Sequence, residues 1–123
     1  MIIIDPGTLL RPPVYLGYKV VSDCLYFWSL SYYNHLIPLI LCYEIGKPIK
    51  RPNNFGPLAV FDELKWAQFF VDHNYGIIFE CHYVLSMDQK LWYIDGNGAR
   101  IDAGRVSPGT EYADEVTILR RVT

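Results

Sequence analysis

One stretch of helical periodicity stands among many short segments that alternate like β-strands, and this contrast limits the 123-residue chain to a mainly β fold. The helical stretch follows Asp62, a residue type that often caps the first turn of a helix. Four apolar residues then recur at the spacing of one helix face: Leu64, Ala67, Phe70 and Val71. The pattern predicts a helix from Asp62 to about Asn74, with one side packed on a sheet.

Seven segments are predicted as strands because they are rich in β-branched and aromatic residues and are bounded by glycine, proline or asparagine. They are residues 14–21, 25–33, 39–45, 58–61, 77–85, 91–94 and 115–122. Residues 46–57 and 95–109 are predicted as loops from their glycine and proline content. We expect 91–94 to form a hairpin with 77–85, and 115–122 to pair with an earlier strand, at an edge that its arginines would protect.

The composition indicates one folded domain. Hydrophobic residues make up 51% of the chain and aromatic residues 15%, so burial can offset the entropy lost on folding and disorder is excluded. We therefore expect a single α+β domain over residues 1–123. Its core would be a curved, mostly antiparallel sheet or half-barrel of about seven strands, with the helix on one face.

Charge and hydropathy indicate a cytoplasmic protein without membrane contact. The net charge of -2 supplies no field that would attract nucleic acid generally. The longest apolar run, Leu36–Tyr43, is interrupted by Pro38 and is far shorter than the ~20 residues of a membrane-spanning helix. The first residues, Met1–Gly7, lack the basic and apolar pattern of a secretory signal.

The three cysteines predict neither a disulfide framework nor a zinc site. Cys24, Cys42 and Cys81 are an odd number at spacings that match no common motif, and each lies in an apolar run. We expect buried, reduced thiols. The stretch Asp95–Arg100 begins like a calcium-binding loop but lacks its later ligands and its glycine, so no metal is expected.

No glycine-rich phosphate loop, nucleophile elbow or zinc-protease motif occurs, which points away from an enzyme. The segment Glu80–His82 holds three reactive residue types, but in a strand Cys81 faces away from the other two. Glu80 and His82 therefore form either a polar row in water or a carboxylate beside a cleft. No cofactor is expected on the first interpretation.

Two segments are candidates for binding another macromolecule. Aromatic residues gather near Trp28 and Tyr33, and they could serve either as core or as interface. The predicted loop 46–57 carries a local positive charge without acidic neighbours, either as a solvated loop or as a patch that steers an acidic partner. Its candidate binding residues are Lys47, Lys50, Arg51 and Phe55. If these residues are only on the surface, reversing the three charges should leave the melting temperature nearly unchanged.

An ordered set of short segments resembles a family of small uncharacterised proteins of phages and other mobile elements. The segments are Gly17–Val21, Cys42–Lys47, Ala59–Phe61, the helix residues Ala67 and Phe70, Gly109–Thr110 and Val116–Arg120. The resemblance implies a viral setting in the host cytoplasm. Such proteins include inhibitors of host defence, among them anti-CRISPR proteins, which occupy the surface of a host protein or protein complex. We expect such a binding protein to be a monomer or a weak dimer.

The order of strands, helix and a glutamate-bearing strand also resembles, more distantly, the ADP-ribosyltransferase fold. This resemblance implies NAD as a cofactor and Glu80 as the catalytic acid, with Tyr18 and Tyr43 beside the same cleft. At the first-strand position, where that fold carries histidine or arginine, this chain has Gly17–Lys19. A binding protein and a transferase-like enzyme therefore remain as the two alternatives.

Overall fold

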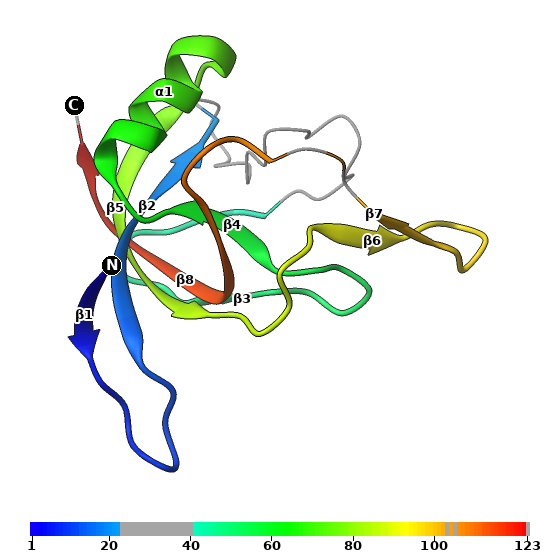
Figure 1. The fold of residues 1–123 in the computed structure, drawn as a ribbon, viewed down its shortest axis with the longest axis horizontal. Coiled ribbons are helices and arrows are strands. Elements are labelled where there is room, and N and C mark those ends of the chain that lie inside the picture. Colours follow the sequence, from blue (N-terminus) through cyan, green and yellow to red (C-terminus); the bar gives the residue numbers. More distant parts are fainter. Residues whose placement is uncertain (23–40, 103, 105, 123) are drawn as a thin grey trace.

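The computed structural model describes residues 1–22, 41–102, 104 and 106–122 (Figure 1). In these residues the chain forms eight strands and one helix. Their bounds are β1 (Ile2–Asp5), β2 (Val14–Val21), β3 (Ile49–Lys50), β4 (Leu58–Phe61), α1 (Leu64–Asn74), β5 (Ile77–Leu85), β6 (Trp92–Ile94), β7 (Arg100–Asp102) and β8 (Thr110–Val122). The expected α+β architecture with one helix is confirmed.

Six of the strands form one antiparallel sheet. Strand β5 lies between β2 and β8, and the long β8 also pairs with β4 and β3. Irregularities in the β5–β8 register, next to Cys81 and Leu85, accompany a strong bend of this sheet. The bend brings β2 back to β4, where they meet at the single pair Tyr18–Phe61. The sheet is therefore curved but is not a closed barrel.

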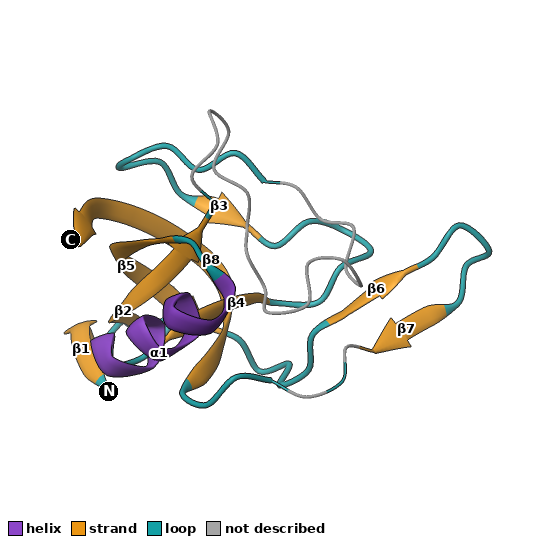
Figure 2. Cartoon of the chain, turned by 90° about the horizontal axis from the view of Figure 1, so that it is seen from above, coloured by secondary structure: helices purple, strands orange, loops and turns teal. Residues whose placement is uncertain are grey.

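The two faces of the sheet bury separate cores, as the alternation of side chains requires. The inner, concave face packs a cluster around Val60, Tyr83 and Ile118. The outer face packs α1 through Ala67 and Phe70 against β2 and β5. Figure 2 shows α1 lying across this outer face, while β6 and β7 extend to one side as a separate two-stranded ribbon.

The start of the helix differs from the expectation. The helix begins at Leu64, the capping position is Glu63, and no side chain caps the first turn. Asp62, predicted as the cap, is half-buried instead, and its Oδ1 atom is buried without a hydrogen-bond partner among the described residues. A carboxylate oxygen buried in this way is a costly arrangement, and Asp62 recurs below as part of a cluster.

One prediction on strand pairing is wrong, and another is right in its partner but wrong in its start. Strand β6 does not form a hairpin with β5, because it pairs with β7 inside the segment that was predicted as the loop 95–109. Strand β8 starts at Thr110 instead of residue 115, but it pairs with an earlier strand, β5, as expected. Its first part lies inside the sheet, whereas its end, with Arg120 and Arg121, pairs with β5 alone among the described strands. The longer β8 is possible because it changes partner, from β4 near its start to β5 beyond.

Other differences concern short or irregular segments. The predicted strand 25–33 lies outside the described residues, as does the start of 39–45, and Leu41–Glu44 are not in a strand. Strands β1 and β3 were not predicted. Cys81 is buried as expected, but Cys42 is exposed, so the prediction of a buried thiol there is wrong. Cys24 lies outside the described residues.

Candidate interaction surface

The predicted basic loop holds an arginine that is committed to the protein's own structure. The guanidinium of Arg51 donates to Asp114 Oδ1 at 3.3 Å, to the Phe55 carbonyl at 3.1 Å and to Asp88 Oδ2 at 3.2 Å. It also lies 5.7 Å from the ring centroid of Trp92. Arg51 thus joins the loop to β8, to the turn after β5 and to β6.

Asp88 is the second centre of this network. It accepts a hydrogen bond of 2.6 Å from the indole Nε1 of Trp92 in addition to the one from Arg51. Burial alone would raise the pKa of Asp88, but the hydrogen bonds from Trp92 and Arg51 outweigh it and lower the pKa below its ordinary value. An arginine held in this way is not available to a partner without breaking these contacts.

The other residues of the loop divide into two kinds. Phe55 packs against Tyr93, with ring centroids 6.5 Å apart, so it closes a small core beside β6. Lys47 and Lys50 are exposed, and Lys47 lies 3.8 Å from Glu44. The part of the predicted patch that faces solvent is therefore two lysines. The aromatic candidates Trp28 and Tyr33 lie outside the described residues.

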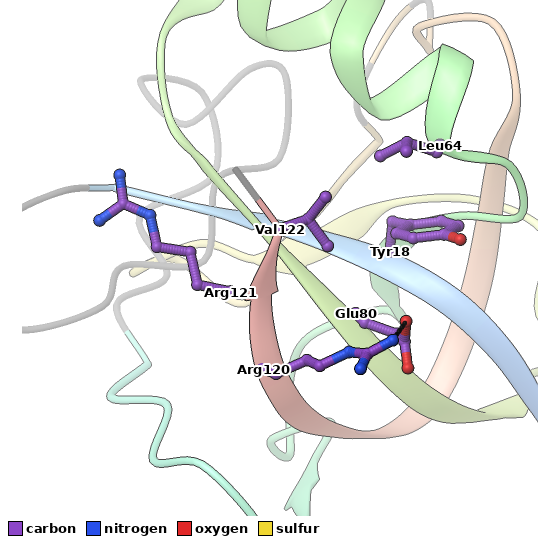
Figure 3. A pocket seen from close by; sticks show the side chains of 6 residues that line it. All are labelled: Tyr18, Leu64, Glu80, Arg120, Arg121 and Val122. Carbon is purple, nitrogen blue, oxygen red and sulfur yellow. Dashed lines mark hydrogen bonds and ion pairs between the residues drawn. The ribbon is translucent and has the colours of Figure 1, made fainter.

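The residues of the transferase interpretation do not surround one cleft. Tyr18 and Glu80 are cross-strand neighbours on the outer face and line a hollow of about 330 Å³ between the start of α1 and the end of β8. Figure 3 shows that Arg120 reaches Glu80 there, at 3.0 Å, while Arg121 points away from the hollow. Tyr43 is buried in the inner core, on the other side of the sheet. Glu80 is thus already neutralised and lies apart from Tyr43.

The inner core contains a buried lysine that sequence reasoning passed over. Lys19 is completely buried, donates to the Ala59 carbonyl at 2.7 Å and lies 5.8 Å from the ring centroid of Tyr43. Burial lowers the pKa of Lys19 to about 8, with a small opposing effect of Cys81. Burial also raises the pKa of Cys81 to about 12, which makes this thiol unreactive at neutral pH.

The surface that stands out is a β-hairpin at the start of the chain, which we call the arm: β1, the loop 6–13 and the first residues of β2. In Figure 1 the arm, in dark and medium blue, projects beyond the rest of the sheet. Its side chains are apolar but exposed: Ile2 (57%), Ile3 (55%) and Ile4 (46%) along β1, and fully exposed Leu9 and Leu10 at the tip. This placement is unusual for large aliphatic side chains in a soluble fold.

The tip of the arm is held by its own hydrogen bonds. Arg11 forms an ion pair with Asp5 at 2.6 Å, and Asp5 also accepts from the Gly7 amide at 2.9 Å. This amide is the main reason that the pKa of Asp5 is lowered. The Thr8 hydroxyl accepts from the amides of Leu10 and Arg11, each at 3.1 Å. The leucines are therefore presented on an ordered turn.

Strand β1 is also an open edge of the sheet. It pairs with β2 on one side and with no described strand on the other. Proteins usually protect such edges with charges, prolines or very short strands. The other edge strand, β3, is two residues long and carries Lys50, whereas β1 presents three isoleucines. The run of isoleucines before Asp5–Gly7 could have indicated a strand here, but the sequence alone does not show that these side chains are exposed.

No protein-family model, curated protein or solved structure matches the chain. Within the described ranges, no helix is long and apolar enough to cross a membrane. Among the same residues, no group of three or more histidines, cysteines, aspartates or glutamates is placed to hold a metal ion.

Proposed function

We propose that the protein is a binding protein that docks onto another protein through the arm. The observation that carries this proposal is the ordered turn that holds Leu9 and Leu10 in solvent, next to an unprotected edge strand. Exposed aliphatic side chains cost solubility, and the exposed part of these side chains packs on none of the described residues. They gain free energy when a partner covers them.

The chemistry of the arm favours a protein over a lipid surface. The outer edge of β1 leaves backbone N–H and C=O groups for a partner strand, as in binding by strand addition. A bilayer core offers no such groups. The only basic side chain at the tip, Arg11, is paired with Asp5, so the tip has no unpaired basic side chain for anionic lipids. The edge gives affinity, and the two leucines give anchors for an apolar pocket.

A binding role by surface occupation agrees with the expectation from the phage-like segments, in which the partner would be a host protein or complex. Inhibition of a host defence complex is the setting we propose on that ground. The transferase alternative gains nothing from the site, because Glu80 is ion-paired and Tyr43 lies on the other side of the sheet.

The experiment compares capture of host proteins by three versions of the chain. The double variant Leu9→Ser/Leu10→Ser removes the apolar tip, and Met87→Ser is the matched control, since Met87 is an equally exposed apolar residue far from the arm in sequence. All three should melt at nearly the same temperature, because exposed side chains contribute little to stability. A partner that the parent and Met87→Ser retain, and the double variant loses, supports the proposal. Equal retention by all three would exclude the arm as the interface.

A further inference from the structure

Two carboxylates and a phenol lie together on the inner face of the sheet; we call Asp62, Glu111 and Tyr83 the carboxylate–phenol cluster. Glu111 is the cross-strand partner of Val60, and Asp62 follows Val60 by two positions. Residues at these register positions share a face, so both carboxylates lie on the inner side. Each of the two side chains keeps part of its surface exposed.

Tyr83 brings its ring to these carboxylates because position 17 is glycine. A Cβ atom at Gly17 would lie 2.7 Å from the Tyr83 ring and 2.9 Å from the Phe61 carbonyl oxygen, so the ring lies over Gly17 and beside the end of β4. Asp62 is the next residue along the chain. Tyr83 is completely buried, and its Oη atom has no hydrogen-bond partner in the part of the chain that the structure describes.

The cluster carries negative charge that no described side chain compensates. Neither Asp62 nor Glu111 takes part in any of the ion pairs between described residues, and Oδ1 of Asp62 is buried there without a hydrogen-bond partner. Burial, and then the charge of Asp62, raise the pKa of Glu111 above its ordinary value, and the N-terminal ammonium of Met1 only partly opposes them. Burial, followed by the charges of Glu111 and Asp62, likewise raises the pKa of Tyr83. These shifts indicate mutual repulsion that a cation would relieve.

We propose that the carboxylate–phenol cluster is a recognition site for a guanidinium or ammonium group, supplied by an arginine or lysine of the protein on which the arm docks. The two carboxylates, each partly exposed, offer acceptors for several N–H donors, and the neighbouring rings of Tyr83 and Tyr15, 5.7 Å apart, suit an organic cation. A hard metal ion is a poorer fit, because Ca²⁺ needs six or more oxygen ligands and Mg²⁺ a regular octahedron.

The position of the cluster connects it to the arm. Tyr15 lies opposite Ile3 of β1 in the hairpin, and its ring packs against Tyr83. The exposed apolar residues of the arm are also fewer than the 20–30 residues that one side of a standard interface provides. A partner seated on the arm would therefore extend over its root, where the cluster lies. The identity of the cation's source rests on the proposed function, but the recognition of the cation itself does not.

The test is a titration of the full chain with agmatine, a small molecule that carries a guanidinium and an ammonium group. Binding is measured by the changes in the NMR chemical shifts of backbone amides. Urea is the control for shape without charge, and calcium chloride is the control for a metal ion. The variants are Glu111→Gln and Tyr83→Phe, with Asp72→Asn as a control that changes the net charge equally on the exposed face of α1. We expect saturable shifts around Gly17, Asp62 and Glu111, and an affinity about tenfold weaker in Glu111→Gln, as for the loss of a charge-assisted hydrogen bond.

The outcomes separate this inference from the proposed function. Binding of agmatine that the arm variant Leu9→Ser/Leu10→Ser retains and Glu111→Gln loses supports the cluster, whether or not the arm captures a partner. Equal shifts with urea, or equal affinity in Glu111→Gln and Asp72→Asn, would overturn the inference. Tight binding of calcium that agmatine cannot displace would also overturn it, because the site would then be a metal site.

Discussion

Replacing the buried lysine by methionine should remove a pH dependence that the native protein carries. Lys19 has a pKa of about 8 in the folded protein, against 10.5 for a free lysine. The unfolded chain therefore binds more protons than the folded one between these values, and the stability rises with pH through this window. This lowering of the pKa corresponds to about 3 kcal/mol of destabilisation while the side chain stays charged.

Only part of this penalty is regained in an accessible pH range. With the two pKa values above, the free energy of unfolding should rise by about 1 kcal/mol between pH 7 and pH 9 from Lys19 alone. Lys19→Met should lack this rise. At pH 7 the variant should have a stability close to the parent's, because the relief of desolvation is offset by the lost hydrogen bond to the Ala59 carbonyl, worth about 1.5–3 kcal/mol.

The assay is urea unfolding at pH 7, 8 and 9 for the parent, Lys19→Met and Lys50→Met. The exposed Lys50 is the matched control, because the same substitution there removes a charge without any burial. Loss of Lys19 removes a charge that lowers the pKa of Cys81, but the folded thiol stays protonated up to pH 9 with or without it, so the contribution of Cys81 cancels in the differences. If the stability difference between parent and Lys19→Met stays constant over this range, the lysine is not held in a desolvated site and the reasoning is refuted.

Three further predictions concern packing and charge. Arg51→Ala should lower stability by about 1–3 kcal/mol in urea unfolding, because it removes several partly buried hydrogen bonds to carboxylates and a carbonyl, whereas Lys50→Ala should change it by less than about 0.5 kcal/mol; equal effects would contradict the network. Gly17→Ala should lower the melting temperature, because its methyl group would meet the Tyr83 ring and a carbonyl oxygen; an unchanged value would show that the ring can move. Glu111→Gln should raise the melting temperature at pH 7 and lose this advantage as the pH falls toward 4. The reason is that the raised pKa of Glu111 destabilises the native protein only while this carboxylate is charged. A constant difference in melting temperature across that range would argue against repulsion at the cluster.

The charge-reversal test that the sequence suggests must be changed in view of Arg51. Reversal of all three basic residues of the loop was expected to leave the melting temperature nearly unchanged, but Arg51 holds four parts of the chain together. A glutamate there would face Asp88 and Asp114. Reversal of Lys47 and Lys50 alone tests the exposed part of the loop without this loss of stability.

Local sequence patterns predicted correctly the elements that have one buried and one exposed face. The strict alternation of residues 77–85 gave the bounds of β5 correctly, and the apolar spacing gave the helix to within two residues. Both predictions work because burial on one face places apolar residues at regular intervals along a short stretch of sequence. The loop-like composition of 95–109, in contrast, hid β7, because a short exposed ribbon needs little hydrophobicity.

The candidate sites depend on distant residues and were harder to predict. Arg51 looked like a surface charge because its partners Asp88 and Asp114 are 37 and 63 residues away in sequence. The cluster of Asp62, Glu111 and Tyr83 likewise draws on three separate elements. The arm could be suspected from its isoleucines, but its exposure follows only from the place of β1 at the edge of the sheet.

Docking through the arm can be tested most directly by hydrogen exchange of the chain with and without a captured partner. The amides on the outer edge of β1 have no described strand to pair with, so they should exchange quickly in the free protein. In the complex, we predict slower exchange in Ile2–Asp5 and in the turn around Leu9, with little change in the loop 46–57. Unchanged exchange in the arm, with protection in that loop instead, would contradict the proposed function.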